Sequence, residues 1–137
     1  MKKINCILLV DDNAADNEYH KIIITQAGVC DHIKVALDGL KALEYIKNSA
    51  KKDQEKDYPK ANLIFLDINM PRVNGFEFLE KYKNLDEKLK SEIVIVMLTT
   101  SLNPDDKKKA ENFKEINSFI HKPLLIELLQ EIVEKNF

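Results

Sequence analysis

Cysteine is scarce in this sequence, and the few histidines are scattered. Cys6 and Cys30 are the only two cysteines among 137 residues, and they form no CxxC pair. The histidines, at positions 20, 32 and 121, do not have the spacing of a zinc motif. We therefore expect no zinc site, and two inert, reduced thiols in a cytoplasmic protein.

Long apolar runs and an excess of basic charge are also missing. No apolar run reaches the length of a membrane span. The stretch MKKINCILLVDD begins with a basic pair and a short apolar run, but that run ends in two aspartates without a cleavage site, which argues against a signal peptide. The formal net charge is −2, and no helix-turn-helix follows the last predicted helix. We therefore expect neither membrane nor DNA as a partner.

Short apolar runs alternate with longer amphipathic ones along the whole chain. Runs of apolar residues predict buried strands at Ile4–Val10, Leu63–Leu66 and Ile93–Leu98, with weaker strands at His32–Ala36 and Ser118–His121. Continuous apolar strands that alternate with helices are typical of a parallel sheet covered on both faces. A length of 137 residues suits one core, so we expect a single α/β domain over residues 1–137, without an output domain.

A helix is predicted after each strand. The first covers Ala14–Ala27, and the fourth begins at an Asn103-Pro104 start with acids in its first turn. The fourth helix has only Ala110 and Phe113 to bury, so it should be the most loosely held. Ser49–Ala61 is charged and should form a long loop. Apolar residues at helical spacing are Tyr19, Ile22, Ile23 and Ala27 in the first helix, Leu40, Leu43 and Ile46 in the second, Phe76, Leu79 and Tyr82 in the third, and Leu124, Leu125, Leu128, Leu129 and Ile132 in the last.

Polar residues follow four of the predicted strands at the point where each strand ends. Asp11-Asp12 follows the first strand, Asp67 the third, Thr99-Thr100 the fourth and Lys122 the fifth. In an open α/β sheet the carboxyl ends of the strands lie along one edge, where ligands bind. Each group alone is ordinary, since a single aspartate after a strand is often a helix cap. Their joint occurrence predicts a site.

The residue types at this edge suit a metal and a phosphoryl group. Carboxylates that lie close together repel one another, and Mg²⁺, which prefers oxygen ligands, removes that conflict. A main-chain carbonyl from Asn69 can add another oxygen. Lys122 and a threonine hydroxyl can bind phosphate oxygens. Asp67, alone at the centre of the sheet, can act as a nucleophile that forms an acyl phosphate.

These residues resemble the receiver domain of bacterial two-component response regulators, in its single-domain, chemotaxis-type form. The motifs LLVDD, LDINMPRVNG, MLTTS and HKP carry the resemblance, which spans nearly the whole chain. It implies a doubly wound (βα)5 flavodoxin-like fold, a five-stranded parallel sheet with strand order 2-1-3-4-5. It implies that Asp67 is the phosphoacceptor, and that Asp11, Asp12, Asp67 and the carbonyl of Asn69 bind Mg²⁺ or Mn²⁺.

The resemblance also implies a switch and a set of partners. Lys122 would bind the phosphate and precede Pro123 through a cis peptide bond, while Thr99 and Phe119 would be the switch residues. Thr100 is an alternative to Thr99. The implied partners are a histidine kinase or phosphotransfer protein and a downstream protein target, with a possible phosphorylation-dependent homodimer. The protein would be a phosphoacceptor that assists its own phosphorylation and dephosphorylation, and otherwise no enzyme.

Two features depart from the usual receiver pattern. The segment from Thr99 to Lys122 is about one residue longer than expected, which leaves the register of the fourth helix open. The charged insertion at Ser49–Ala61 is similar to that of a subgroup of stand-alone receivers, some of which serve phytochrome-like kinases.

Three other functions compete with the receiver. A receiver-like module can bind partners without phosphorylation, but such a module typically lacks one of the site groups. A phosphatase of the haloacid dehalogenase type needs a second acid two residues after the nucleophile, where this sequence has Asn69. Nucleotide or flavin binding needs glycine after the first strand, and DDNAADNE has none.

Overall fold

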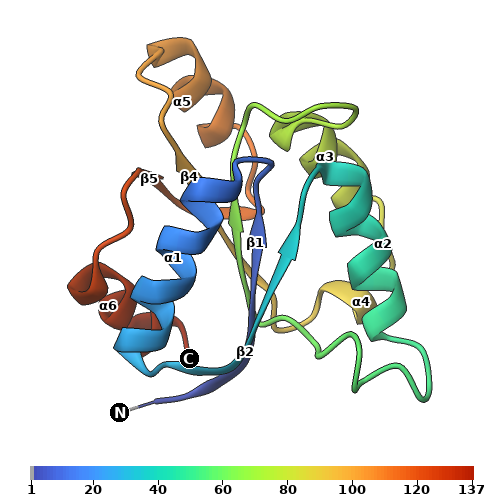
Figure 1. The fold of residues 1–137 in the computed structure, drawn as a ribbon. Helices are drawn as coiled ribbons and strands as arrows, with labels where there is room; N and C mark the ends of the chain where they lie inside the picture. Colours follow the sequence, from blue (N-terminus) through green and yellow to red (C-terminus); the bar gives the residue numbers. More distant parts are fainter. Residues whose placement is uncertain (1) are drawn as a thin grey trace.

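A five-stranded parallel sheet forms the centre of the computed structural model, which describes residues 2–137 (Figure 1). The strand order is β2-β1-β3-β4-β5, and all four neighbouring pairs are parallel. This confirms the predicted doubly wound α/β fold. The strands are β1 (Ile4–Val10), β2 (Cys30–Ala36), β3 (Leu63–Leu66), β4 (Val94–Thr99) and β5 (Ile116–His121).

Helices cover both faces of the sheet. Buried residues of α1 and α6 pack on one face, and those of α2, α3 and α5 pack on the other. A further helix of one turn, α4, which the sequence pattern did not predict, lies between α3 and β4. The helices are α1 (Ala14–Ala27), α2 (Gly39–Ser49), α3 (Gly75–Tyr82), α4 (Glu87–Lys90), α5 (Pro104–Glu111) and α6 (Ile126–Asn136).

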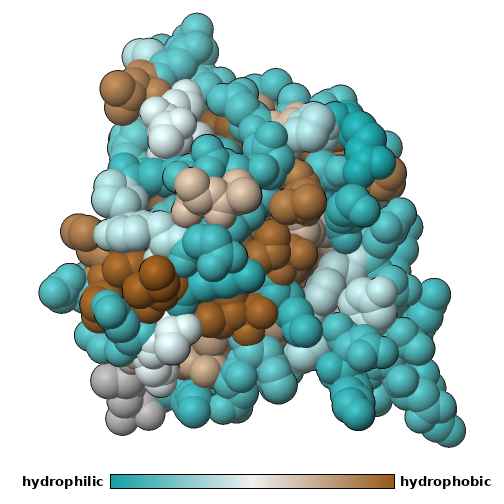
Figure 2. Space-filling model, viewed as in Figure 1, coloured by the Kyte–Doolittle hydropathy of each residue, from teal (hydrophilic) through white to brown (hydrophobic). Residues whose placement is uncertain are grey.

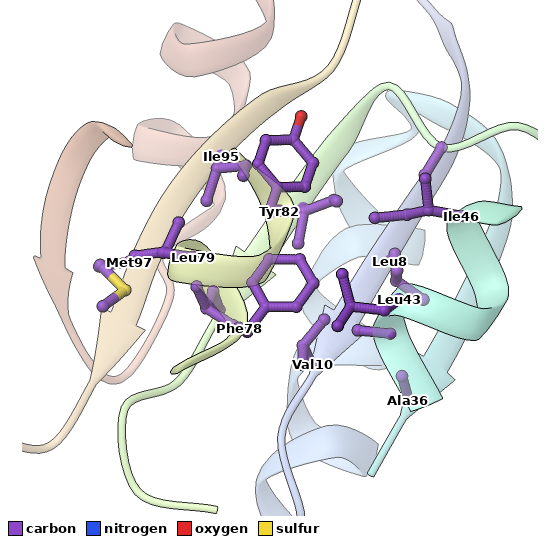
Figure 3. Packing of buried hydrophobic residues seen from close by; sticks show 14 of the residues in the cluster. Leu8, Val10, Ala36, Leu43, Ile46, Phe78, Leu79, Tyr82, Ile95 and Met97 are labelled. Atoms are coloured by element: carbon purple, nitrogen blue, oxygen red, sulfur yellow. The ribbon is translucent and has the colours of Figure 1, made fainter. Parts of the chain in front are cut away.

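Two hydrophobic clusters lie on the two sides of the sheet. Strand β1 contributes to both, because its side chains alternate: Leu8 and Val10 join one cluster, while Ile7 and Leu9 join the other. Figure 3 shows the first cluster, in which side chains of α2 and α3 meet those of β1 and β4. All four residues of β3 are buried. The central strands are therefore rigid supports for the residues that follow them.

The inward face of α1 differs from the predicted one. Tyr19 and Ile22 are 45% and 54% exposed, and the buried positions of the helix are Asn17, His20, Ile24 and Ala27. Polar residues take the inward positions near the start of α1 because that end of the helix lies against the charged edge of the sheet. Figure 2 shows a hydrophobic band crossing an otherwise largely hydrophilic face on this side of the molecule.

Several element boundaries also differ from the expected ones. Strands β2 and β5 each begin two residues earlier than predicted, and α6 begins at Ile126 instead of Leu124. Leu124 is buried just before α6, whereas Leu125 is 54% exposed and not in the core as expected. Residues 50–62 form no helix or strand, in agreement with the predicted loop. Within residues 2–137, no helix combines the length and the apolar character that a bilayer span requires.

Candidate functional site

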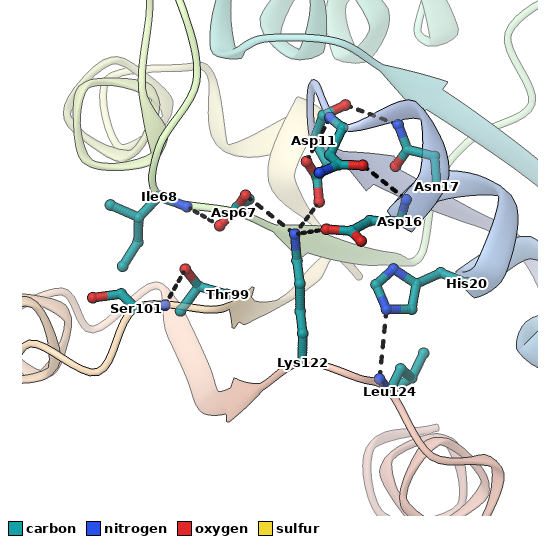
Figure 4. A network of polar contacts seen from close by, with 11 residues as sticks. Asp11, Asp16, Asn17, His20, Asp67, Ile68, Thr99, Ser101, Lys122 and Leu124 are labelled. Atoms are coloured by element: carbon teal, nitrogen blue, oxygen red, sulfur yellow. Dashed lines mark hydrogen bonds and ion pairs between the residues drawn. The ribbon is translucent and has the colours of Figure 1, made fainter.

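The carboxyl edge of the sheet brings together residues that are far apart in the sequence (Figure 4). Asp11 and Asp12 follow β1, and Asp67 follows β3. Carboxylate oxygens of these three residues all lie within 4.8 Å of one another. Asp11 and Asp67 are buried, whereas Asp12 is exposed. The three residues, which we call the acidic cluster, lie where strands β1 and β3 run side by side.

The Lys122 ammonium lies among these carboxylates. Its Nζ is 2.6 Å from Asp11 Oδ2, 2.7 Å from Asp16 Oδ2 and 3.3 Å from Asp67 Oδ2. Its side chain is only 8% exposed. Burial alone would lower the pKa of Lys122, but the hydrogen bonds to Asp11 and Asp16 and the charge of Asp67 raise it above the ordinary value. The ammonium therefore stays charged and offsets part of the negative charge of the site.

Asp67 lies at the carboxyl end of β3, with its carboxylate close to those of Asp11 and Asp12. Its Oδ1 accepts a hydrogen bond of 2.8 Å from the Ile68 amide. Burial raises the pKa of the Asp67 carboxyl above its ordinary value. The Thr99 hydroxyl and the Lys122 ammonium offset only part of this shift, and the charge of Asp11 adds to it. The ionised carboxylate is thus disfavoured, and a cation placed beside it would relieve the cost.

The loop after Asp67 folds back closely on the site. The Gly75 amide donates a hydrogen bond of 2.8 Å to the Ile68 carbonyl. A Cβ at Gly75 would lie 2.4 Å from the Asp67 carbonyl oxygen, so only glycine fits there without a shift of the backbone. Asn69 lies exposed within this loop, two residues after Asp67. The turn therefore keeps the Asn69 backbone near the phosphoacceptor candidate.

The donor set fits a hard divalent cation. The acidic cluster offers only oxygen ligands, which Mg²⁺ and Mn²⁺ accept. Lys122 pairs with Asp11 and Asp67 of this cluster, and a single ammonium beside three carboxylates leaves an excess of negative charge there. Asp11, Asp12 and Asp67 would hold the ion, and the backbone carbonyl of Asn69 is placed on the adjoining loop.

The remaining predicted site residues lie on β4 and β5. Thr99 is fully buried at the end of β4, and its carbonyl accepts a hydrogen bond from the Lys122 amide, whereas Thr100 is exposed. This burial favours Thr99 over Thr100 as the residue that faces the site. Phe119, on β5, is half-buried, and its ring contacts His121 edge-on. The Lys122–Pro123 peptide bond is cis, as the resemblance implies.

Three polar residues of α1 belong to the site, although the sequence pattern did not single them out. Asp16 pairs with Lys122, and the Asn17 side-chain amide donates a hydrogen bond of 2.9 Å to the Asp11 carbonyl. His20 is buried, and its Nε2 accepts a long hydrogen bond of 3.5 Å from the Leu124 amide. Burial and the nearby Lys122 charge lower the pKa of His20, which favours the neutral imidazole. The sequence signal that could have revealed them is the presence of polar residues at helix positions that should face the core.

Comparison with known proteins agrees with this geometry. The family model described as the response regulator receiver domain matches residues 7–134. A probable methanogenesis regulatory protein, FilR2 of Methanothrix harundinacea, is 35% identical over 133 residues, which cover 94% of this chain and 79% of FilR2. The response regulator Rcp1 of Synechocystis is 35% identical over 101 residues, which cover 73% of this chain and 65% of Rcp1. The aligned region thus covers just under two thirds of the Rcp1 sequence.

Solved structures give the same result. The structure of the phosphorylated cyanobacterial phytochrome response regulator RcpA has a TM-score of 0.72 and is 30% identical, covering 96% of this chain and 89% of RcpA. The Mn²⁺-bound form of Rcp1 has a TM-score of 0.70 and is 30% identical in that superposition, covering 96% and 90%. With the matched family model and the acidic edge of the sheet, these likenesses establish that the chain belongs to the response regulator receiver domain family of two-component systems.

Proposed function

We propose that this protein is a receiver whose Asp67 takes a phosphoryl group from a histidine kinase or phosphotransfer protein. The observation that carries the proposal is the convergence of Asp11, Asp12 and the Lys122 ammonium on the Asp67 carboxylate. An Asp67 oxygen attacks the phosphorus of a phosphohistidine. The O–P bond forms as the P–N bond breaks, and the imidazole leaves with a proton from solvent.

The site residues act by position and charge. A bound Mg²⁺ would neutralise the carboxylates and the incoming phosphoryl oxygens. The Lys122 ammonium, which lies 3.3 Å from Asp67 Oδ2, would bind an oxygen of the phosphoryl group as a point charge. The Thr99 hydroxyl, buried at the end of β4, would donate a hydrogen bond to another phosphoryl oxygen. Because transfer depends mostly on positioning and charge neutralisation, no further general acid is needed.

The signal would leave the site through β4 and β5. Movement of Thr99 toward the phosphoryl group vacates space, and the half-buried Phe119 rotates inward, which repacks the face formed by α5, β5 and α6. This is a shift between two packings that local charge biases. A downstream protein, or a second copy in a phosphorylation-dependent homodimer, would read the altered face. In this proposal the chain acts in the cytoplasm as a single receiver domain and signals without turning over a substrate.

Phosphorylation with a small donor tests the proposal. We expect acetyl phosphate with Mg²⁺ to add one phosphoryl group to the wild type, seen by intact-mass spectrometry, and to add none without Mg²⁺. Asp67→Asn should abolish the addition, while Asp57→Asn, an exposed aspartate of the charged loop, should leave it unchanged. Full Mg²⁺-dependent phosphorylation of Asp67→Asn would refute the assignment. A wild type that takes up no phosphoryl group would favour the module that binds partners without phosphorylation.

A further inference from the structure

The three carboxylates that contact Lys122 are not equivalent. Asp11 and Asp67 belong to the acidic cluster, which offers oxygens to a cation. Asp16 lies outside that cluster, and its Oδ2 is 2.7 Å from Lys122 Nζ. Among residues 2–137, three carboxylates contact Lys122. Asp16 is the one of them that would still pair with the ammonium when a metal ion occupies the acidic cluster.

This difference matters when a divalent cation enters. In the structure Lys122 makes its shortest contact with Asp11, at 2.6 Å, so the ammonium competes for a carboxylate that the metal also needs. A divalent cation held by Asp11 and Asp67 would repel the ammonium and would pair with the carboxylates that the ammonium contacts in this structure. A lysine whose side chain is only 8% exposed cannot be left without a partner at low cost.

We propose that Asp16 is a positioning residue that holds the Lys122 ammonium while a divalent cation occupies Asp11, Asp12 and Asp67. The inference rests on the metal-dependent function proposed above and adds a residue to it. Asp16 keeps the lysine paired after Asp11 has turned to the metal, and it keeps Nζ beside Asp67, where a phosphoryl group would arrive. Metal binding is then an exchange of partners at Asp11 in which the buried ammonium stays paired.

The local structure of α1 fixes Asp16 for this task. The Asn13 side chain caps the helix and accepts a hydrogen bond of 3.0 Å from the Asp16 amide, which sets the first turn. An acid in the first turn of a helix commonly just complements the helix dipole. Here the carboxylate instead reaches Lys122, 106 positions later in the chain, and the side chain is only 34% exposed. This long-range contact separates Asp16 from an ordinary first-turn acid.

Calorimetric titration of the unphosphorylated protein with Mg²⁺ measures the effect without any phosphoryl transfer. We expect Asp16→Asn to weaken Mg²⁺ binding about fivefold, which is within the range of coupling between groups that share a partner. Asp16→Glu should recover most of the affinity. Glu18→Gln removes the same charge from a neighbouring exposed position of α1, where the carboxylate pairs with Lys21, and should change the affinity less than about twofold.

A double-mutant cycle with Lys122→Met separates positioning from net charge. If Asp16 acts by holding Lys122, its substitution should change Mg²⁺ affinity less than about twofold once the lysine is gone. If Asp16 acts only through its charge, the loss should be as large or larger in the Lys122→Met background, because no ammonium then screens it. Equal or larger losses without the lysine would overturn the positioning role, as would unchanged affinity of Asp16→Asn.

The wild-type titration distinguishes failure of this inference from failure of the proposed function. A wild type that binds no Mg²⁺ in the millimolar range typical of weak sites would overturn both. A wild type that binds Mg²⁺ and is phosphorylated on Asp67, together with an Asp16→Asn variant of equal Mg²⁺ affinity, would overturn the role of Asp16 alone. Thermal unfolding of each variant without metal identifies any loss of affinity that arises from a damaged fold.

Discussion

Helix α3 follows Asp67 and helix α5 follows Thr99, and the two are held to the sheet in different ways. Five of the eight residues of α3 are buried, and Phe78 and Leu79 are fully so. Its N-terminus has a capping box, in which Asn74 and Glu77 each accept a hydrogen bond from the other's backbone amide. A helix with these contacts is a fixed support for the loop that carries Asn69.

Helix α5 has the same length as α3 but buries far fewer side chains. Ala110 is its single buried residue, and Phe113, just after the helix, stacks on Phe76 of α3. The Lys109 ammonium lies 4.6 Å from the centre of the Phe76 ring. Asn103 caps the N-terminus of α5, but the helix buries little surface against the sheet. Few buried contacts are typical of segments that open or repack at low cost.

The contrast separates the two tasks of a receiver. In the function proposed here, the side that follows Asp67 must keep its geometry, because it would supply the loop that helps to bind the metal. The side that follows Thr99 must change its packing if a partner is to read the phosphorylated state. Both sides are built from a strand followed by a helix of eight residues. They differ in the number of buried side chains, which is five in α3 and one in α5. Three substitutions probe this difference.

Phe78→Ala should have the largest effect on stability. Phe78 is fully buried in the cluster between α2, α3 and the sheet, so its truncation leaves a cavity and should lower the free energy of unfolding by about 3–5 kcal/mol. Leu102→Ala, in the loop before α5, removes a side chain that is 82% exposed and should cost less than about 0.5 kcal/mol. Urea unfolding measures both. Similar losses would mean that the two sides are equally anchored.

Asp38→Asn should have an intermediate effect that depends on pH. The buried Asp38 carboxylate caps α2 through the Lys41 amide and pairs with Arg72, which ties the loop before α3 to α2. Asparagine keeps the cap but loses the ion pair, which should cost about 1–2 kcal/mol at pH 7 because Arg72 is partly exposed.

The pKa shift of Asp38 gives the sign of the pH dependence. Burial would raise its pKa, but the Lys41 amide and Arg72 lower it below the ordinary 3.8. Its contribution to stability is therefore complete above pH 3.8 and is lost as pH falls through the lower folded-state pKa. Unfolding curves of wild type and Asp38→Asn should converge in acid. A difference that stays the same at pH 3 and pH 7 would show that the charge contributes nothing.

Lys109→Ala should have the smallest effect, confined to α5. Loss of the contact with Phe76 should cost about 0.5 kcal/mol and should speed amide hydrogen exchange in α5 while α3 is unchanged. Lys108→Ala, one residue earlier on the same exposed helix, is the matched control. Faster exchange in both helices would show that α3 and α5 open as one unit, against the contrast drawn here.

The sequence pattern predicted the sheet and most helix starts because these depend on local signals. Continuous apolar runs defined β1, β3 and β4, and Asn103-Pro104 marked the start of α5, where the helix begins. The strand order came from the family resemblance, and the structure confirms it. The single turn of α4 lies in a polar segment whose residues give no periodic pattern, and it was missed.

Neither the inward face of α1 nor the proposed role of Asp16 could be predicted from the local sequence. Tyr19 and Ile22 have the apolar character of core residues, but the start of α1 lies against the charged edge, where Asn17 and His20 find polar partners instead. The Asp16–Lys122 pair joins residues 106 positions apart, and its existence depends on how the last strand meets the first helix. Such contacts follow from tertiary packing and leave no periodic trace in the sequence.

Chemical mapping of the phosphoryl group tests the central claim most directly. Protein treated with acetyl phosphate and Mg²⁺ would be reduced with borohydride, which converts an aspartyl phosphate to homoserine, and its peptides sequenced by mass spectrometry. We predict conversion at position 67 alone, and none when Mg²⁺ is withheld. Conversion at Asp11, Asp12 or another residue, with position 67 intact, would contradict the account.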